Sequence, residues 1–192
     1  MQYKDINVET VIDIAFKAGA EILTVYAQDF DVEIKGDNSP LTAADRKANA
    51  VILEGLKVNY ADIPYISEEV KATAYDERKA WSRFLLIYPM DGTKEFIKKN
   101  GEFTVNIALI EEGEPVLGVV YAPAKGIGYV GAKGLGAYTY GNDGKLVQIK
   151  NETHYSQKEK VIVVGSRSHE TPETIAFVDK LKASGKEVDF AA

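Results

Sequence analysis

The residues best suited to chemistry are Asp91, Gly92 and Thr93, which come directly after the apolar run at residues 84–87. Such a run followed by a turn predicts a buried strand that presents Asp91 at its end. A carboxylate is a preferred ligand of a hard divalent cation, and backbone amides at the start of a following helix can bind an anion. The segment could therefore hold a metal ion and a phosphate together.

Two other acidic segments also lie at the ends of elements. Asp45 falls in the first turn of an expected helix, and Glu68 and Glu69 follow a short apolar run. Each acid has an ordinary alternative: Asp45 as a helix-start acid, Glu68 and Glu69 as a solvated loop, and Asp91 as a turn residue. Taken singly, these positions favour the ordinary interpretation. Their joint occurrence favours a site.

The composition narrows the chemistry further. The 192 residues include no cysteine, which excludes disulfides, thiol nucleophiles and cysteine-bound zinc. The two histidines, His154 and His169, exclude a histidine-rich metal site. Oxygen ligands remain, and these suit Mg2+, Mn2+ or Ca2+. The net charge of -6 argues against polymeric nucleic acid as a partner, because phosphate neutralisation needs clustered Lys and Arg.

The chain has the composition of a globular protein, with 45% hydrophobic residues. No apolar run approaches the ~20 residues of a transmembrane helix, and the first residues lack a signal-peptide pattern. We therefore expect a cytoplasmic protein, with a peripheral position at the inner membrane as an alternative.

The acidic segments need elements that position them. Apolar residues at three- and four-residue steps predict an amphipathic helix from about 7 to 27. A second helix is expected from about 42 to 56, after a break at 36–40. Alternation at 103–109 and 115–121 predicts a hairpin. Further strands are expected at 64–66, 84–87, 127–132, 136–140 and 145–150.

The sequence predicts that the last part of the chain forms a separate segment. We expect an N-terminal α+β metal- and phosphate-binding domain at 1–150 and a polar linker at 151–160. A strand at 161–164 and a helix at 172–183 then begin a C-terminal α/β domain at 161–192, which we expect to be incomplete because a strand and a helix cannot bury a core alone.

Six motifs occur in a fixed order: S-P-L-T-A-A-D (39–45), I-S-E-E (66–69), P-M-D-G-T-K-E-F (89–96), N-G-E-F-T-V-N-I-A-L-I (100–110), G-V-V-Y-A-P (118–123) and S-R-S-H (166–169). This order resembles the 3'(2'),5'-bisphosphate nucleotidases of the CysQ type, in the inositol monophosphatase-like superfamily. The resemblance implies a layered α/β fold, the sugar-phosphatase αβαβα sandwich, and removal of the 3'-phosphate of adenosine 3',5'-bisphosphate to give AMP.

The resemblance also implies roles for single residues. Glu68 would be shared between metal and the attacking water, while Asp91 and the Met90 carbonyl would be metal ligands. Asp45 and Thr93 would orient or deprotonate that water. The implied cofactor is Mg2+, two or three ions per site, with Mn2+ as an alternative.

Substrate contacts are implied as well. The implied substrate-binding residues are Glu68, Met90, Asp91, Gly92, Thr93, Ser166 and His169, of which Gly92 and Thr93 would bind phosphate through their amides. His169 as an ordinary surface histidine remains the alternative. The implied partner is a small phosphorylated nucleotide.

Position 88 departs from the family pattern, which has an Asp there that bridges two metals. Tyr88 offers a phenol with a pKa near ~10, which is uncharged at neutral pH and a weak ligand. Its ring is also bulkier than a carboxylate, and Mg2+ needs short oxygen contacts. We therefore expect impaired turnover. The alternatives are an inactive homologue with residual metal or phosphate binding, and a docking role in which the second segment self-associates.

Overall fold

The computed structural model describes residues 1–28, 32–34, 40–150, 157–165 and 171–191. The chain divides into two compact units, Met1–Ile149 and Lys150–Ala192, which are described separately. No helix in the described part of the chain combines the length and the apolar character needed to cross a membrane.

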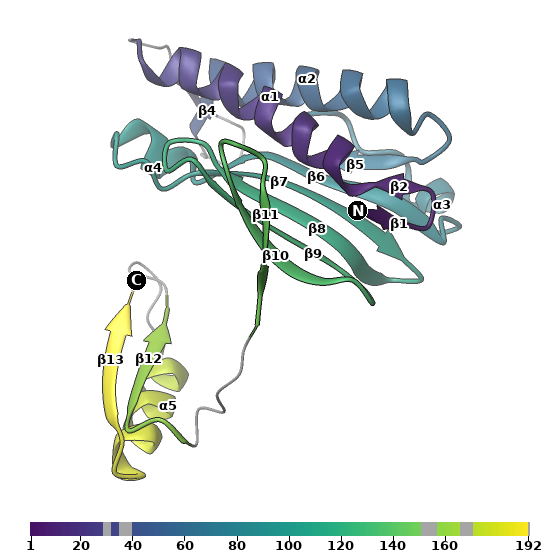
Figure 1. The fold of residues 1–192 in the computed structure, drawn as a ribbon. Helices are drawn as coiled ribbons and strands as arrows, with labels where there is room; N and C mark the ends of the chain where they lie inside the picture. The colour runs from purple at the N-terminus through teal and green to yellow at the C-terminus, as the bar shows by residue number, and fades with distance from the viewer. Residues whose placement is uncertain (29–31, 35–39, 151–156, 166–170, 192) are drawn as a thin grey trace. The chain divides into compact units, whose positions relative to one another are not determined.

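A seven-stranded sheet forms the centre of the first unit (Figure 1). Its strands are β5 (Tyr65–Ser67), β6 (Arg83–Asp91), β7 (Thr104–Glu111), β8 (Glu114–Ala122), β9 (Ile127–Ala132), β10 (Gly136–Gly141) and β11 (Leu146–Ile149). They lie in sequence order across the sheet, from β5 at one edge to β11 at the other. Within this sheet β5 and β6 are parallel, and the other neighbouring strands are antiparallel.

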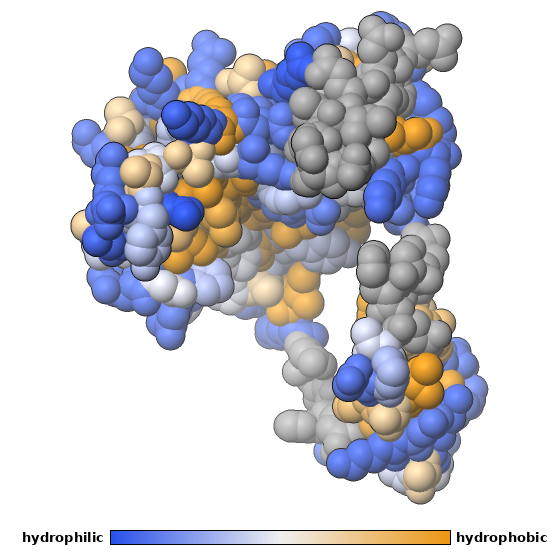
Figure 2. All heavy atoms as spheres, turned by 180° about the vertical axis from the view of Figure 1, so that it is seen from behind, coloured by the Kyte–Doolittle hydropathy of each residue, from blue (hydrophilic) through white to orange (hydrophobic). Residues whose placement is uncertain are grey.

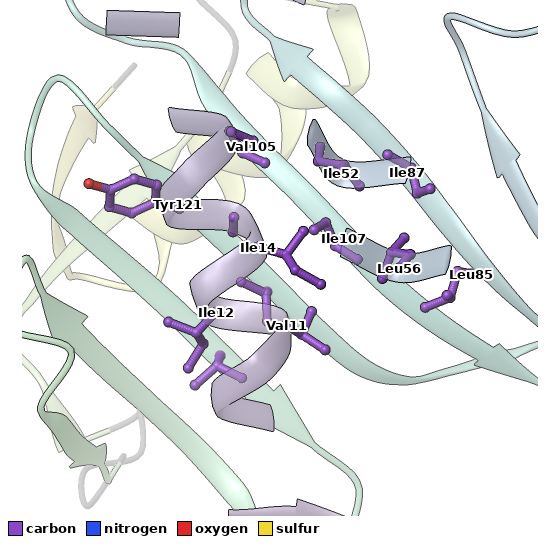
Figure 3. Packing of buried hydrophobic residues seen from close by; sticks show 14 of the residues in the cluster. Val11, Ile12, Ile14, Ile52, Leu56, Leu85, Ile87, Val105, Ile107 and Tyr121 are labelled. Atoms are coloured by element: carbon purple, nitrogen blue, oxygen red, sulfur yellow. The ribbon is translucent and has the colours of Figure 1, made fainter. Parts of the chain in front are cut away.

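Two long helices cover one face of this sheet (Figure 1), α1 (Val8–Tyr26) and α2 (Ala43–Asn59). The Asn7 side chain caps α1 by accepting hydrogen bonds from the Glu9 and Thr10 amides, which are otherwise without a helical partner. Apolar side chains of both helices meet those of the strands, as Figure 3 shows for Ile52 and Leu56 beside β6.

The remaining elements of this unit are short: β1 (Gln2–Tyr3), β2 (Ile6–Asn7), β3 (Val32–Ile34), β4 (Pro40–Thr42), α3 (Tyr75–Arg78) and α4 (Thr93–Ile97). β1 pairs with β2, and β3 pairs with β4, each in antiparallel fashion. α4 matters for the site because it begins directly after Gly92.

The second unit consists of β12 (Lys160–Val164), α5 (Pro172–Ala183) and β13 (Glu187–Ala191). β12 and β13 are parallel, and the Thr171 hydroxyl caps α5 by accepting from the Thr174 amide. None of its described residues is fully buried. Apolar side chains are visible on the surface of both units in Figure 2. The exposed large apolar residues of the second unit include Ile162, Val164 and Phe177.

Most elements agree with the sequence expectations. The helix expected at 7–27 is found as α1, the hairpin as β7 and β8, and the helix at 172–183 as α5. The short β1–β2 pairing and α3 were not expected, because elements of two to four residues are too short for a periodic pattern of apolar residues to be recognised in the sequence. The expected break at 36–40 and the linker at 151–160 lie mostly outside the described residues.

Candidate active site

The first turn of α2 carries Asp45, whose side chain is 1% exposed. The same face of the helix buries Ala44, Ala48, Ile52 and Leu56, so Asp45 lies at the end of an apolar stripe. Burying a carboxylate is unfavourable unless other groups compensate it. Asp45 is an acid in the first turn of its helix, as the ordinary alternative has it, and it is buried there.

The parallel pair β5 and β6 brings the second and third acidic segments to one edge. Ser67 pairs with Ile87, so Glu68 follows the last paired residue of β5 next to Tyr88 of β6. Parallel strands end at the same edge of a sheet. Glu68 is exposed and Glu69 half-buried, while Tyr88 is 40% exposed.

A buried hydrogen bond joins α2 to the end of β5. The Ser67 hydroxyl donates to Asn49 Oδ1 at 2.7 Å, and both side chains are buried. Asn49 lies one helical turn after Asp45, and Ser67 directly precedes Glu68. Sequence reasoning missed this pair, because nothing in the pattern of either segment identifies the other as its partner.

The backbone changes direction between Tyr88 and Asp91. Tyr88 pairs with Asn106 and Asp91 with Thr104, so three steps along β6 match two along β7, which is a β-bulge. Bulges of this kind re-aim side chains and are over-represented beside active sites. The Met90 side chain is fully buried, whereas Asp91 is exposed at the end of the strand.

Gly92 completes this turn and begins α4. Its φ is +91°, a left-handed conformation that favours glycine, and its carbonyl accepts the first helical hydrogen bond, from the Phe96 amide at 2.9 Å. Thr93 is then the first residue of α4. Amides at the first positions of a helix have no partner within it, and they are available in principle to an anion.

A polar pair on β7 faces these residues in the register of the sheet. Thr104 Oγ1 and Asn106 Nδ2 lie 3.1 Å apart, opposite Asp91 and Tyr88 respectively. Sequence reasoning missed this pair too. Its signal would have been two polar residues at alternate positions of a strand that is otherwise apolar.

The fit of a divalent cation can be judged from the available ligands. Glu68, Asp91 and the Met90 carbonyl are oxygen ligands of the type that Mg2+ prefers. Within the described ranges, no three Asp, Glu or His side chains lie close enough together to hold a metal ion. The acidic position missing from this set is 88, where the side chain is a phenol. The ligand types fit Mg2+, but the set of carboxylates is small. Ser166 and His169 lie outside the described residues.

Comparison with known proteins identifies the family to which the chain is similar. The family model described as inositol monophosphatase family matches residues 6–188. The 3'(2'),5'-bisphosphate nucleotidase CysQ of Salmonella typhimurium is 45% identical over 179 residues, covering 90% of this chain and 68% of that protein. CysQ of Escherichia coli K12 is 42% identical over 175 residues, with the same coverage of both chains.

A solved structure agrees with these sequence matches. The crystal structure of CysQ from Bacteroides thetaiotaomicron, described as a bacterial member of the inositol monophosphatase family, has a TM-score of 0.79 and 38% identity. The match covers 98% of this chain and 72% of that one. The resemblance read from the motifs and the layered α/β fold class are thereby confirmed. This chain belongs to the inositol monophosphatase family.

Proposed function

We propose that this chain is a Mg2+-dependent phosphatase that removes the 3'-phosphate of adenosine 3',5'-bisphosphate, giving AMP, with turnover reduced by Tyr88. The observation that carries the proposal is the buried hydrogen bond that links two of the acidic segments, those of Asp45 and Glu68. Asp45 is buried in the first turn of α2, and Asn49 one turn later bonds to Ser67, which directly precedes Glu68. The named activity of the two CysQ relatives supports the choice of substrate.

The proposed roles follow from the chemistry of phosphate esters. Glu68, Asp91 and the Met90 carbonyl would hold Mg2+, with Mn2+ as an alternative. Such an ion supplies positive charge that makes water more acidic and neutralises the phosphoryl oxygens. Asp45 and Thr93 would orient the attacking water and accept its proton.

The remaining residues would bind the substrate. The amides of Gly92 and Thr93 would bind the phosphate, and Ser166 and His169 would contact the nucleotide. In the reaction a P–O bond to the water oxygen forms, the P–O bond to the 3'-oxygen breaks, and that oxygen takes up a proton. Most of the rate enhancement for this chemistry comes from positioning and charge neutralisation.

Tyr88 is the reason to expect slow turnover. Changes around metal ligands typically cost about 10–100-fold in affinity or activity, and loss of a ligand should cost more. The test compares phosphate release from adenosine 3',5'-bisphosphate by the native chain, Tyr88→Asp and Leu86→Asp. Leu86 is the matched control, because it lies on the same face of β6 two residues earlier and is similarly exposed (44% against 40%).

We expect Tyr88→Asp to raise turnover and Mg2+ affinity by at least about 10-fold, and Leu86→Asp to change neither. A native chain that is already as fast as Tyr88→Asp would overturn the impairment. Absence of phosphate release from every variant, with Mg2+ shown to bind by calorimetry, would overturn the phosphatase function.

A second candidate function is protein docking by the second unit. The observation that favours it is the exposure of Ile162, Val164 and Phe177 on a unit without a fully buried described residue. An exposed apolar surface of this kind is typical of an interaction site. Light scattering of the native chain and of Val164→Lys tests it: a native dimer that the substitution dissociates supports self-association, and a monomeric native chain excludes it.

A further inference from the structure

The polar contact between Asn49 and Ser67 stands out from its surroundings. Asn49 is 7% exposed and Ser67 4%, and with Asp45 they are the buried polar side chains among the described residues. The residues of α2 next to Asn49 on the buried side, Ala48 and Ile52, are apolar. A helix packed on a sheet needs no such pair for its stability, because apolar residues of similar volume serve equally well.

The pair links the two segments that carry the proposed active-site acids Asp45 and Glu68. Asp45 and Asn49 are four residues apart, so they share one face of α2. On the other side, the Ser67 oxygen donates to Asn49 and also lies 3.4 Å from the Glu69 amide, from which it accepts. The hydroxyl therefore fixes the backbone on both sides of Glu68 and ties it to the helix that carries Asp45.

The chemistry of the pair suits this role. Both side chains are neutral at every pH at which the protein is folded, so they add no charge to a cluster of acids. A lysine or arginine at either position could also hold the two elements together, but it would compete with a cation for the carboxylates. Hydrogen-bonded neutral groups fix the geometry and leave the charge of the acids to a metal ion.

We propose that Asn49 and Ser67 are positioning residues that set the placement of Glu68 relative to Asp45, and through it the Mg2+ affinity and the rate of phosphate release. This inference rests on the proposed function. Neither residue needs to touch the substrate. In metalloenzymes, groups that orient the ligands typically contribute about 10–100-fold in metal affinity or activity.

The experiment uses the full chain, with and without Tyr88→Asp, so that turnover is measurable. Ser67→Ala removes the hydroxyl, Asn49→Ala removes the acceptor, and Ser67→Thr retains the hydroxyl. Thr139→Val is the matched control, because it removes a side-chain hydrogen bond of similar kind, from Thr139 Oγ1 to the Gly128 carbonyl at 3.1 Å, on a distant strand of the same sheet. The readouts are kcat, KM, the Mg2+ concentration for half-maximal rate, and the thermal midpoint.

We expect Ser67→Ala and Asn49→Ala each to lower kcat by about 10-fold or more and to raise the Mg2+ requirement, with KM nearly unchanged. The double variant should be little worse than either single one, because the residues act as a unit. Ser67→Thr should restore the rate, and Thr139→Val should lower the thermal midpoint without affecting kcat or the Mg2+ requirement.

Two results would overturn the inference, and they are distinguishable. If Ser67→Ala matches Thr139→Val in kcat and Mg2+ requirement while Tyr88→Asp is active, the pair is only structural. If neither the native chain nor Tyr88→Asp binds Mg2+ or releases phosphate, the proposed function fails and the inference with it.

Discussion

Arg83 holds both carboxylate oxygens of Asp5. Its Nη1 donates to Oδ2 at 2.9 Å and its Nη2 to Oδ1 at 2.6 Å. Glu111, on the neighbouring strand, extends this pair, with Oε1 3.1 Å from Arg83 Nε and Oε2 2.5 Å from Lys4 Nζ. The turn between β1 and β2 is thus tied to the start of β6 and the end of β7 by a network of four charged residues.

Arg83→Met should lower the free energy of unfolding of the first unit by about 1 kcal/mol at neutral pH. A network that contains a bidentate ion pair stabilises the fold more than a single exposed ion pair does. The hydrogen bond from Arg83 lowers the pKa of Asp5 from its ordinary 3.8, and that from Lys4 lowers the pKa of Glu111 from 4.5. A lowered carboxyl pKa stabilises the fold above the ordinary value, and this stability is lost as the pH falls through the folded-state pKa.

The difference in the free energy of unfolding between Arg83→Met and the native chain should therefore shrink as the pH falls below the ordinary carboxyl pKa values, 4.5 for Glu111 and 3.8 for Asp5. Urea unfolding followed by fluorescence of Trp81, the single tryptophan, reports on this unit. Lys133→Met is the control, because it breaks the exposed Lys133–Glu114 pair and should change stability little. A pH-independent difference between Arg83→Met and the native chain would contradict the electrostatic explanation.

Gly128 makes room for the ring of Tyr140 on the adjacent strand. A Cβ at Gly128 would lie 2.1 Å from Tyr140 Cζ and 2.3 Å from Cε2, closer than any real contact. Tyr140 is fully buried, so its ring has no open space to move into. Gly128→Ala should therefore lower the free energy of unfolding by about 3 kcal/mol, the upper end for overpacking.

The matched control for Gly128→Ala is Gly118→Ala. Gly118 is also in a strand of this sheet, but a Cβ there would meet nothing within 4 Å. We expect this variant to keep the native thermal midpoint within one or two degrees or to raise it slightly. Equal losses in the two variants would show that the strand backbone, and not the Tyr140 ring, requires glycine.

Two buried tyrosines differ in what their hydroxyls contact. The Tyr121 hydroxyl donates to Asn142 Oδ1 at 3.0 Å, whereas that of Tyr140 has no hydrogen-bond partner among the described residues. Tyr121→Phe should therefore lower the free energy of unfolding by about 1 kcal/mol, and Tyr140→Phe should raise it by up to about 1 kcal/mol.

The loss of stability at high pH tests the same difference between the tyrosines. Burial raises the pKa of both Tyr121 and Tyr140 above 10.0. A raised pKa means that each tyrosine loses its proton in the unfolded state first. The contribution of these tyrosines to the free energy of unfolding is therefore lost as the pH rises above about 10. Tyr140→Phe should reduce this loss. If Tyr140→Phe loses as much stability at high pH as the native chain does, other groups cause that loss.

The sequence indicated much of the fold because its long elements have clear periods. α1 and the β7–β8 hairpin follow from apolar spacing alone, and α5 begins with a proline directly after a capping threonine. The acidic residues lie at the ends of other elements, Asp45 in the first turn of α2, Glu68 after β5 and Asp91 at the end of β6, and their place beside apolar runs was enough to identify them as candidates. Their motifs also led to the family.

The pairings between distant segments could not be predicted in this way. Asn49 and Ser67 are 18 residues apart, and Asp5 and Arg83 are 78 apart. A single polar residue in an apolar segment signals that it needs a partner, but not which one. The close approach of Gly128 and Tyr140 could not be predicted from the sequence either, because it depends on the antiparallel pairing of β9 and β10.

The turn at Gly92 combines backbone conformation and close packing, and the two can be separated by substitution. Its φ of +91° is strained for any residue with a side chain, and a Cβ would also lie 2.6 Å from the Glu102 carbonyl oxygen. Gly113, in the turn between β7 and β8, has a φ of +79° with nothing within 4 Å of a Cβ. Gly113→Ala therefore bears the backbone cost alone, about 1–2 kcal/mol.

Gly92→Ala bears the same backbone cost plus the steric overlap, so its thermal midpoint should fall clearly below that of Gly113→Ala. Because Gly92 lies between Asp91 and Thr93, the backbone shift that relieves the overlap must also move these two proposed active-site residues. In the Tyr88→Asp chain, Gly92→Ala should lower phosphate release by about 100-fold, since misplacements of about 1 Å have effects of this size. Gly113→Ala should leave the rate unchanged. Equal stability and equal rates in the two variants would mean that the turn accommodates a side chain and that the placement of Asp91 does not depend on glycine.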